Sequence, residues 1–293
     1  MLELNVLQQK TLDSLVRTQN CSACHIIPTE KMYGLDGTDL KKATTELAGG
    51  LNRNGSSCGA IFGGSINIAL RNYVQSHESK KMSDVELLQK IGMFVKSFDD
   101  EFGSIRCREI LGLNLRTKLG QIGLLLPNKN RHCKNQAKWG MEYFYKNPDI
   151  NDHSSMQEVN HCSSRVWDML KDEKSFDDPY LRELSKGFSG GIGLSGGACG
   201  ALSSLVMYLG VLFRKIKIQK GDIPAGKESY KILRETTHII VDKFIQKFKS
   251  IDCKDLTQMK LYDIDDFSKY REEVGCEKIY DFIHEIITSE SLM

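Results

Sequence analysis

The sequence has little proline or tryptophan, almost no net charge and no long apolar run. Its 293 residues include five Pro and two Trp, and 40 Lys and Arg nearly balance 38 Asp and Glu, which gives a net charge of +2. A chain this close to neutrality lacks the basic surface that nucleic-acid binding requires, so we expect no nucleic-acid partner. Its length suits one large domain or two modest ones.

No segment has the pattern of a secretion signal or of a membrane span. The first twenty residues mix charged and polar side chains and contain no long apolar run. The longest uncharged stretch, residues 187–213, begins rich in Gly and Ser and leaves about fifteen helix-like residues, fewer than the ~20 that a bilayer requires. We therefore expect a cytoplasmic protein without a membrane span, in which this stretch forms a buried core helix.

The chain repeats itself at an offset of 141 residues. Residues 47–60, LAGGLNRNGSSCGA, align without gaps on residues 188–201, FSGGIGLSGGACGA. A repeat of this length indicates a tandem duplication. We assign residues 1–150 to copy one and residues 151–293 to copy two, with a linker near KNPDINDHSSMQ, whose Pro, Asn, Asp and Ser are typical of loops.

Eight of the nine cysteines recur at equivalent positions of the repeat. They are Cys21, Cys58, Cys107 and Cys133 in copy one, and Cys162, Cys199, Cys253 and Cys276 in copy two. Most aligned apolar positions differ between the copies whereas all four cysteines agree, which favours chemistry over core packing. The ninth cysteine, Cys24, has no counterpart, since copy two has Arg165 at that place.

The periodicity of apolar residues is helical throughout. SDVELLQKIGMFVKSFDDEFG, which starts at Ser83, and ESYKILRETTHIIVDKFIQKFK, which starts at Glu228, have apolar residues three and four apart, and alternating β-branched runs are missing. Ser83 is a good N-cap for the first of these helices. We therefore predict an all-α fold, with two tandem helical bundles related by duplication.

Several cysteines follow residues that favour the start of a helix. Cys21 follows Asn20, Cys58 follows two Ser, Cys199 follows two Gly, and Cys133 lies soon after two Asn. The free N–H groups and partial positive charge of a helix N-terminus favour thiolate over thiol, so we expect lowered thiol pKa values. The neighbouring histidines His25, His132 and His161 have no His in the other copy, and we expect them to be solvated.

Two familiar motifs occur in the sequence, but the residues around them do not support the function that each motif usually has. Gly191, Gly193 and Gly196 spell GxGxxG, but a helical segment precedes them and no acidic residue follows about 20 residues later, so we predict no dinucleotide site. Cys21 and Cys24 with His25 spell CxxCH, but no export signal is present and copy two lacks the motif, so no c-type haem is expected. No pattern typical of a hydrolase or metalloprotease appears, which leaves open whether the protein is an enzyme.

The order of cysteines and glycines resembles that of the C_GCAxxG_C_C family, whose members are classed as redox-active. Each copy has a Cys, a Gly-Gly loop, a Cys-Gly-Ala, a further Cys and a last Cys. The resemblance covers both copies, and is more distant to the iron–sulfur-type domain of split-Soret cytochromes. It implies a four-cysteine helical domain in each copy. Copy one departs from the pattern at Asn52, where copy two has Gly193, which predicts that the two sites differ in integrity or in redox potential.

Three interpretations of the cysteines stay open. Four thiolates could hold an iron–sulfur cluster in each copy, up to two per chain, for electron transfer with a redox partner protein. Pairs of thiols could instead cycle between dithiol and disulfide without a metal, or four thiolates could close a structural zinc site. In the first case, glycines beside the cysteines would let the backbone approach the cofactor; they are Gly49, Gly50, Gly59, Gly190, Gly191 and Gly200.

Overall fold

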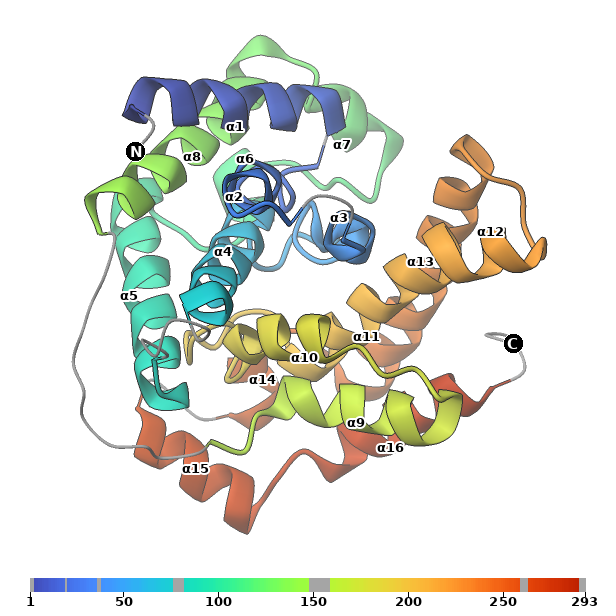
Figure 1. Cartoon of the computed structure of the whole chain (residues 1–293). Coiled ribbons are helices and arrows are strands. Elements are labelled where there is room, and N and C mark those ends of the chain that lie inside the picture. The colour runs from blue at the N-terminus through green and yellow to red at the C-terminus, as the bar shows by residue number, and fades with distance from the viewer. Residues whose placement is uncertain are drawn as a thin grey trace.

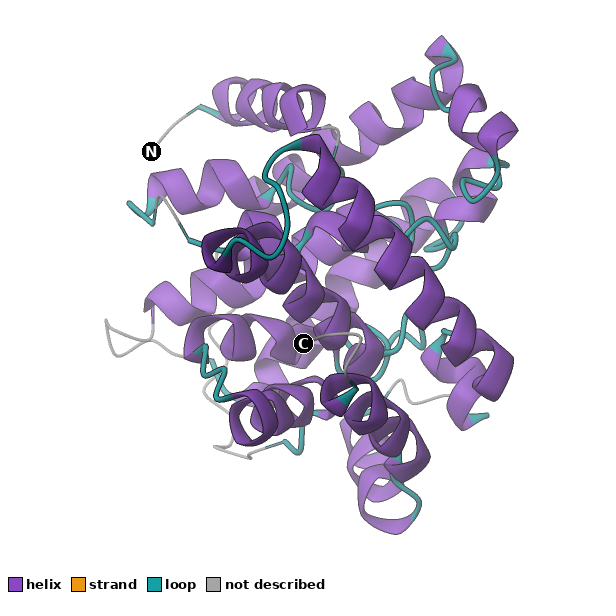
Figure 2. Ribbon diagram, turned by 90° about the vertical axis from the view of Figure 1, so that its right-hand side faces the viewer, coloured by secondary structure: helices purple, strands orange, loops and turns teal. Residues whose placement is uncertain are grey.

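The computed structural model describes residues 3–18, 20–35, 38–75, 82–147, 159–258 and 263–289. Within these ranges the chain is helical and has no β-strand, only two isolated β-bridges (Figures 1 and 2). The all-α prediction is confirmed. The boundary that we placed at residue 150 lies outside the described residues.

The described residues of copy one form eight α-helices and one short 3-10 helix. They are α1 (Leu4–Thr18), α2 (Ile26–Met32), α3 (Leu40–Ala43), η1 (Thr45–Leu47), α4 (Gly59–Gln75), α5 (Asp84–Phe102), α6 (Cys107–Leu111), α7 (Lys118–Gly123) and α8 (Pro127–Lys146).

The described residues of copy two follow a similar order from the first cysteine onward, with η4 and α12 in addition. Its elements are α9 (Cys162–Lys174), α10 (Pro179–Ser185), η3 (Lys186–Phe188), α11 (Gly200–Val211), the π-helical turn η4 (Leu212–Ile216), α12 (Lys217–Lys220), α13 (Lys227–Phe248), α14 (Cys253–Thr257), α15 (Ile264–Glu273) and α16 (Glu277–Thr288).

The two long helices predicted from periodicity are α5 and α13. Ser83 forms a capping box, in which its side chain accepts from the Glu86 backbone N–H while the Glu86 side chain accepts from the Ser83 backbone N–H. Gly103, with a φ of 74°, ends α5 in the left-handed conformation that glycine adopts without strain. Local sequence signals therefore set the bounds of this helix.

The uncharged stretch becomes the central helix α11. All of its residues from Gly200 to Val211 are buried, as expected for a core helix. Among the described helices, none combines the length and the apolar character that crossing a membrane would need.

The two copies pack against each other reciprocally. Helix α4 of copy one contacts α10 and η3 of copy two, and α11, its counterpart in copy two, contacts α3 and η1 of copy one. Figure 1 shows the blue helices of copy one and the yellow helices of copy two meeting in the middle of the molecule. The rings of Phe62 and Phe188 meet edge to face there, with centroids 5.3 Å apart. One apolar core runs through both copies, so each copy completes the other.

Candidate functional site

In copy two, all four repeated cysteines line one pocket. Cys162 is the first residue of α9, Cys199 is the N-cap of α11, Cys253 is the first residue of α14, and Cys276 is the N-cap of α16. The sequence separates these residues widely, and the fold brings their four helix starts to one place. The rest of the wall is mostly apolar or aromatic, apart from a single charged side chain, that of Arg271.

A pair of backbone hydrogen bonds holds the second and third cysteines of each copy side by side. In copy two, the Cys199 N–H donates to the Ile251 carbonyl at 2.8 Å, and the Cys253 N–H donates to the Gly197 carbonyl at 2.6 Å. Copy one has the same pair: the Cys58 N–H bonds the Ile105 carbonyl and the Cys107 N–H bonds the Ser56 carbonyl, both at 2.8 Å. These bonds form the two isolated β-bridges, so the same local device positions both thiol pairs.

The four repeated cysteines of copy one also gather, and Cys24 joins them. Cys21 and Cys133 pack against the buried Cys24, and Cys133 packs against Cys107 as well. Cys58 lies near enough to Cys107, Cys21 and Cys133 for their charges to influence its pKa. Our sequence analysis left Cys24 as an unmatched thiol. The signal that could have placed it is the CxxC spacing, which sets Cys24 on the same turn as Cys21, where its Sγ donates to the Cys21 carbonyl.

The glycines beside the cysteines make room for backbone and sulfur. A Cβ on Gly59 would lie 2.2 Å from the Cys21 Sγ, and a Cβ on Gly200 would lie 3.0 Å from the Cys162 Sγ. Gly49, Gly50, Gly190 and Gly191 all have positive φ and stand where a Cβ would meet neighbouring atoms, which for Gly191 include the Cβ of Cys253. The close approach that we expected is present, and a contact between these glycines and a cofactor stays a prediction.

Burial raises the pKa of seven of the repeated thiols, which overturns our expectation of lowered values for them; they are Cys21, Cys58, Cys107, Cys133, Cys199, Cys253 and Cys276. For Cys58, desolvation is the largest cause, followed by the negative charge that Cys107, Cys21 and Cys133 would carry, whereas the Ala60 backbone N–H opposes the rise. Burial and Cys21 raise the pKa of Cys133 to about 12. Helix N-termini do direct N–H groups at the sulfurs, but their effect is smaller than the loss of hydration and the crowding of thiols.

Six of the eight repeated cysteines lie at helix starts, and two do not. Cys133 is the seventh residue of α8, because Pro127 begins that helix one turn earlier than the asparagines suggested. Cys21 lies in a turn five residues before α2. Pro28 falls in the first turn of α2, where its missing N–H would be unpaired anyway. The prediction was therefore wrong for Cys21 and Cys133.

Two of the three histidines are buried rather than solvated. His25 is fully buried with its Nε2 3.0 Å from the Ala137 carbonyl, and burial lowers its pKa to about 4. His161 lies between Ser189 Oγ, 2.9 Å from its Nδ1, and the Asp84 carboxylate, 3.2 Å from its Nε2. Only His132 is exposed as expected. This buried contact joins His161 and Ser189 of copy two to Asp84, the first residue of α5 in copy one.

None of the nine cysteines is in a disulfide. Within the described part of the chain, no three His, Cys, Asp or Glu side chains are gathered as the ligands of a single metal ion.

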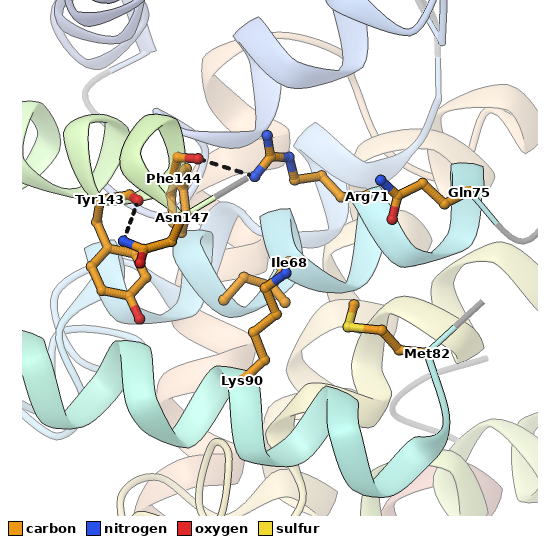
Figure 3. Close-up of a pocket in the computed structure, with 8 residues that line it drawn as sticks. All are labelled: Ile68, Arg71, Gln75, Met82, Lys90, Tyr143, Phe144 and Asn147. Carbon is orange, nitrogen blue, oxygen red and sulfur yellow. Dashed lines mark hydrogen bonds between the residues drawn. The ribbon is translucent and has the colours of Figure 1, made fainter. Parts of the chain in front are cut away.

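A second pocket lies away from the cysteines, among α4, α5 and α8. Figure 3 shows the Arg71 guanidinium directed at the Phe144 carbonyl, to which it donates at 3.3 Å, and the Asn147 amide bonded to the Tyr143 carbonyl at 2.9 Å. No cysteine lines this pocket, and its polar groups bond the protein itself. We assign no function to it.

The family model described as "Putative redox-active protein (C_GCAxxG_C_C)" matches residues 19–144 and 160–289. The chain belongs to this family. Each matched segment contains four of the repeated cysteines, in agreement with two tandem C_GCAxxG_C_C copies. Neither the curated proteins nor the solved structures contain a match to the chain.

Proposed function

We propose that each C_GCAxxG_C_C copy holds one iron–sulfur cluster on its four repeated cysteines and that the protein transfers electrons. The observation that carries the proposal is the pocket of copy two, whose wall contains all four cysteines of that copy. Iron–sulfur clusters are held by four Cys thiolates. A bound cluster would supply a redox centre that gains and loses single electrons.

The raised pKa values of the thiols support a cationic occupant. Burial and the neighbouring cysteines raise the pKa of Cys199 and Cys253 above the ordinary value for a thiol. Four crowded, buried thiols lose their protons together only when a positive charge compensates them, and metal binding supplies that charge. The apolar wall, with Phe267 and Ile279, would keep water from the cofactor.

The backbone around the sulfurs supports the same assignment. Backbone N–H groups of Ala201 and Leu202 are directed at Cys199, and those of Gly49 and Gly59 at Cys21. Hydrogen bonds from the protein to the sulfurs are one of the means by which iron–sulfur sites set their potential. The glycines keep these N–H groups close, since a side chain on Gly59 would displace the Cys21 sulfur.

The two alternatives make different demands on the same thiols. A zinc site needs four sulfurs about 2.3 Å from one point, and a metal count distinguishes zinc from iron. Thiol–disulfide exchange needs a reactive thiolate, whereas burial raises the pKa of Cys24 and of Cys58 well above the usual value. The pair Cys21 and Cys24, on one turn, is the place where a disulfide would form if this alternative holds.

The experiment is a visible spectrum with counts of iron, acid-labile sulfide and zinc on protein purified without oxygen. We expect brown protein with two clusters per chain. Colourless protein without iron would overturn the proposal, and zinc or two lost thiols per copy on mild oxidation would identify which alternative holds. A finding of iron in the cytoplasmic fraction, with reduction by a separate electron-transfer protein, would complete the assignment.

Matched variants test the four-cysteine assignment. Cys58→Ser should remove the cluster of copy one and leave that of copy two, and Cys199→Ser should do the reverse. Cys24→Ser is the control, because it removes a buried thiol of the same site that the repeat does not use, and both clusters should remain. Loss of iron in Cys24→Ser equal to that in Cys58→Ser would contradict the assignment of ligands in copy one.

A further inference from the structure

The pocket of copy two has a buried cation in its wall. Arg271 lies on α15, is 8% exposed, and lines the pocket together with the four cysteines (α15 is the red helix at the lower edge of Figure 1). Its Nε and Nη1 are buried without a nitrogen or oxygen partner, its Nη2 donates to the Asn160 Oδ1 at 3.4 Å, and the guanidinium also hydrogen-bonds the Cys276 thiol. Leaving guanidinium N–H groups unpaired in a buried place is unfavourable unless an anion faces them.

No carboxylate neutralises Arg271. Among the described residues, no acidic side chain lies within ion-pair distance of it, and its other neighbour is the ring of Tyr280, 5.3 Å from the guanidinium carbon. The second arginine on this side, Arg165, is held by Glu277 through two hydrogen bonds of 2.6 and 2.7 Å, so that pair is neutral together. Among the residues that line the pocket, Arg271 has the one charged side chain.

In copy one, the buried polar side chains described next to the thiols are neutral, and the nearby cation, Arg108, is exposed. The side chain that reaches Cys58 is Gln136, whose Oε1 accepts from the thiol at 3.3 Å and whose Nε2 is buried without a partner. His25, the nearest buried base, is uncharged at neutral pH because its pKa is about 4. Both copies have an exposed cation directly after the third cysteine, Arg108, whose charge reaches Cys107, and Lys254, so the buried cation Arg271 is what distinguishes copy two.

We propose that Arg271 faces the cluster and its four thiolates in the copy-two pocket, whose summed charge is negative, and makes copy two the site that accepts electrons, while copy one donates them. The inference deepens the proposed function and rests on it. Reduction adds negative charge to the site, and a nearby buried positive charge stabilises the reduced form. Electrons that enter the protein at copy one would therefore be transferred to copy two, the site of higher potential, and from there to the acceptor protein.

The first test uses the metal-free, reduced protein and two alkylating probes. Iodoacetate is an anion and iodoacetamide is neutral. We take the rate of alkylation by iodoacetate divided by that by iodoacetamide at the same cysteine. The reactivity of the thiolate enters both rates and cancels, so this ratio reports the local charge. We expect a higher ratio at Cys276 than at Cys133, measured by mass spectrometry. Arg271→Gln should lower the ratio at Cys276 several-fold, and Arg271→Lys should retain most of it.

The control is Lys278→Gln, which removes an exposed cation two residues from Cys276 and should leave the ratio unchanged. The iodoacetamide rate shows whether a variant has opened the pocket. Equal ratios at Cys276 and Cys133 in the unmodified protein would overturn the inference without any variant, and so would an unchanged ratio in Arg271→Gln.

The second test measures midpoint potentials in the metal-loaded protein. Cys58→Ser leaves copy two alone and Cys199→Ser leaves copy one alone, so each site can be titrated separately. We expect the higher potential in copy two, and a negative shift there in Arg271→Gln that Arg271→Lys reduces. Protein without iron would refute the proposed function and leave the alkylation ratio to decide on Arg271, whereas loaded protein with equal potentials would refute this inference alone.

Discussion

Gly193 lies directly against Gly92 of α5, and neither residue has room for a side chain. A Cβ on Gly92 would lie 2.8 Å from the Gly193 carbonyl oxygen, and a Cβ on Gly193 would lie 2.6 Å from the Gly92 nitrogen. At the equivalent place in copy one, Asn52 meets His238 of α13. With its oxygen turned toward His238, the Asn52 amide accepts from the His238 backbone N–H at 2.8 Å and donates to Glu46 at 3.0 Å. The two junctions are equivalent by the repeat and differ in chemistry.

Gly92→Ala should destabilise the protein by about 1–3 kcal/mol, because the new methyl group meets backbone rather than a side chain that can move. Chemical denaturation would measure the change. Met93→Ala, on the same helix and 44% exposed, is the control and should change the free energy of unfolding by no more than about 0.5 kcal/mol. Equal stability of Gly92→Ala and the parent protein would show that the two copies do not pack as described.

The repeat predicted most of the fold and most of each site. It identified the eight cysteines, and helical periodicity found α5 and α13, because both signals are local in the sequence. Asn52 illustrates what could not be found: the loss of a glycine predicted a weakened site, but the loop keeps its left-handed backbone, with a φ of 52° at Asn52, and gains polar contacts with the other copy. That compensation depends on a residue 186 positions away, which spacing alone does not reveal.

Burial was the other property beyond the reach of the sequence. Helix starts were expected to lower thiol pKa values, but the thiols face each other inside the protein and burial is the larger effect. Neither Cys24 nor Arg271 obeys the repeat. The CxxC spacing could have placed Cys24 beside Cys21, whereas only the tertiary structure brings Arg271 to the thiols. Departures from the duplicated pattern thus occur at the two sites themselves.

A second junction between the copies lies beside the thiols. Asp252, 5% exposed, accepts one hydrogen bond from Ser56 Oγ and pairs with Arg106 at 2.5 Å, and Ser57 Oγ accepts from the Ala198 N–H at 2.9 Å. Each of these residues lies one or two positions before the second or third cysteine of its copy. The two sites are therefore supported by one shared set of contacts.

Asp252→Asn should lower the free energy of unfolding by about 1–3 kcal/mol, because Arg106 loses the partner of a largely buried ion pair. Asp255→Asn provides the comparison: its carboxylate is 46% exposed and lies 3.5 Å from the same arginine, so its loss should matter by about 1 kcal/mol or less. Both variants can be measured by thermal and chemical unfolding. If the two have equal effects, the buried position of Asp252 has no special role in joining the copies.

His25 should make the protein less stable as the pH falls below neutrality. Its pKa is about 4 when folded and about 6.5 when unfolded, so between these values the unfolded chain binds more protons and stability rises with pH. His25 therefore adds up to about 1.4 kcal/mol per pH unit to the slope of the unfolding free energy against pH between pH 4 and 6.5. In His25→Gln the slope of unfolding free energy against pH should fall by this amount, and in His132→Gln, whose imidazole is exposed, it should not change. An unaltered slope in His25→Gln would mean that the imidazole is not held neutral.

Gly59→Ala should empty the site of copy one without changing any cysteine. The added Cβ would lie 2.2 Å from the Cys21 Sγ, a separation that real atoms do not adopt, so the sulfur must move away from the other thiols. Because a cluster needs all four thiolates in place, we expect the iron content to fall toward that of Cys58→Ser, with copy two unaffected. Gly92→Ala is the matched control, since it also adds a methyl group to a tightly packed helical glycine but lies away from the cysteines. Iron content that falls equally in both variants would attribute the loss to general destabilisation, and full occupancy in Gly59→Ala would remove Cys21 from the ligands of copy one.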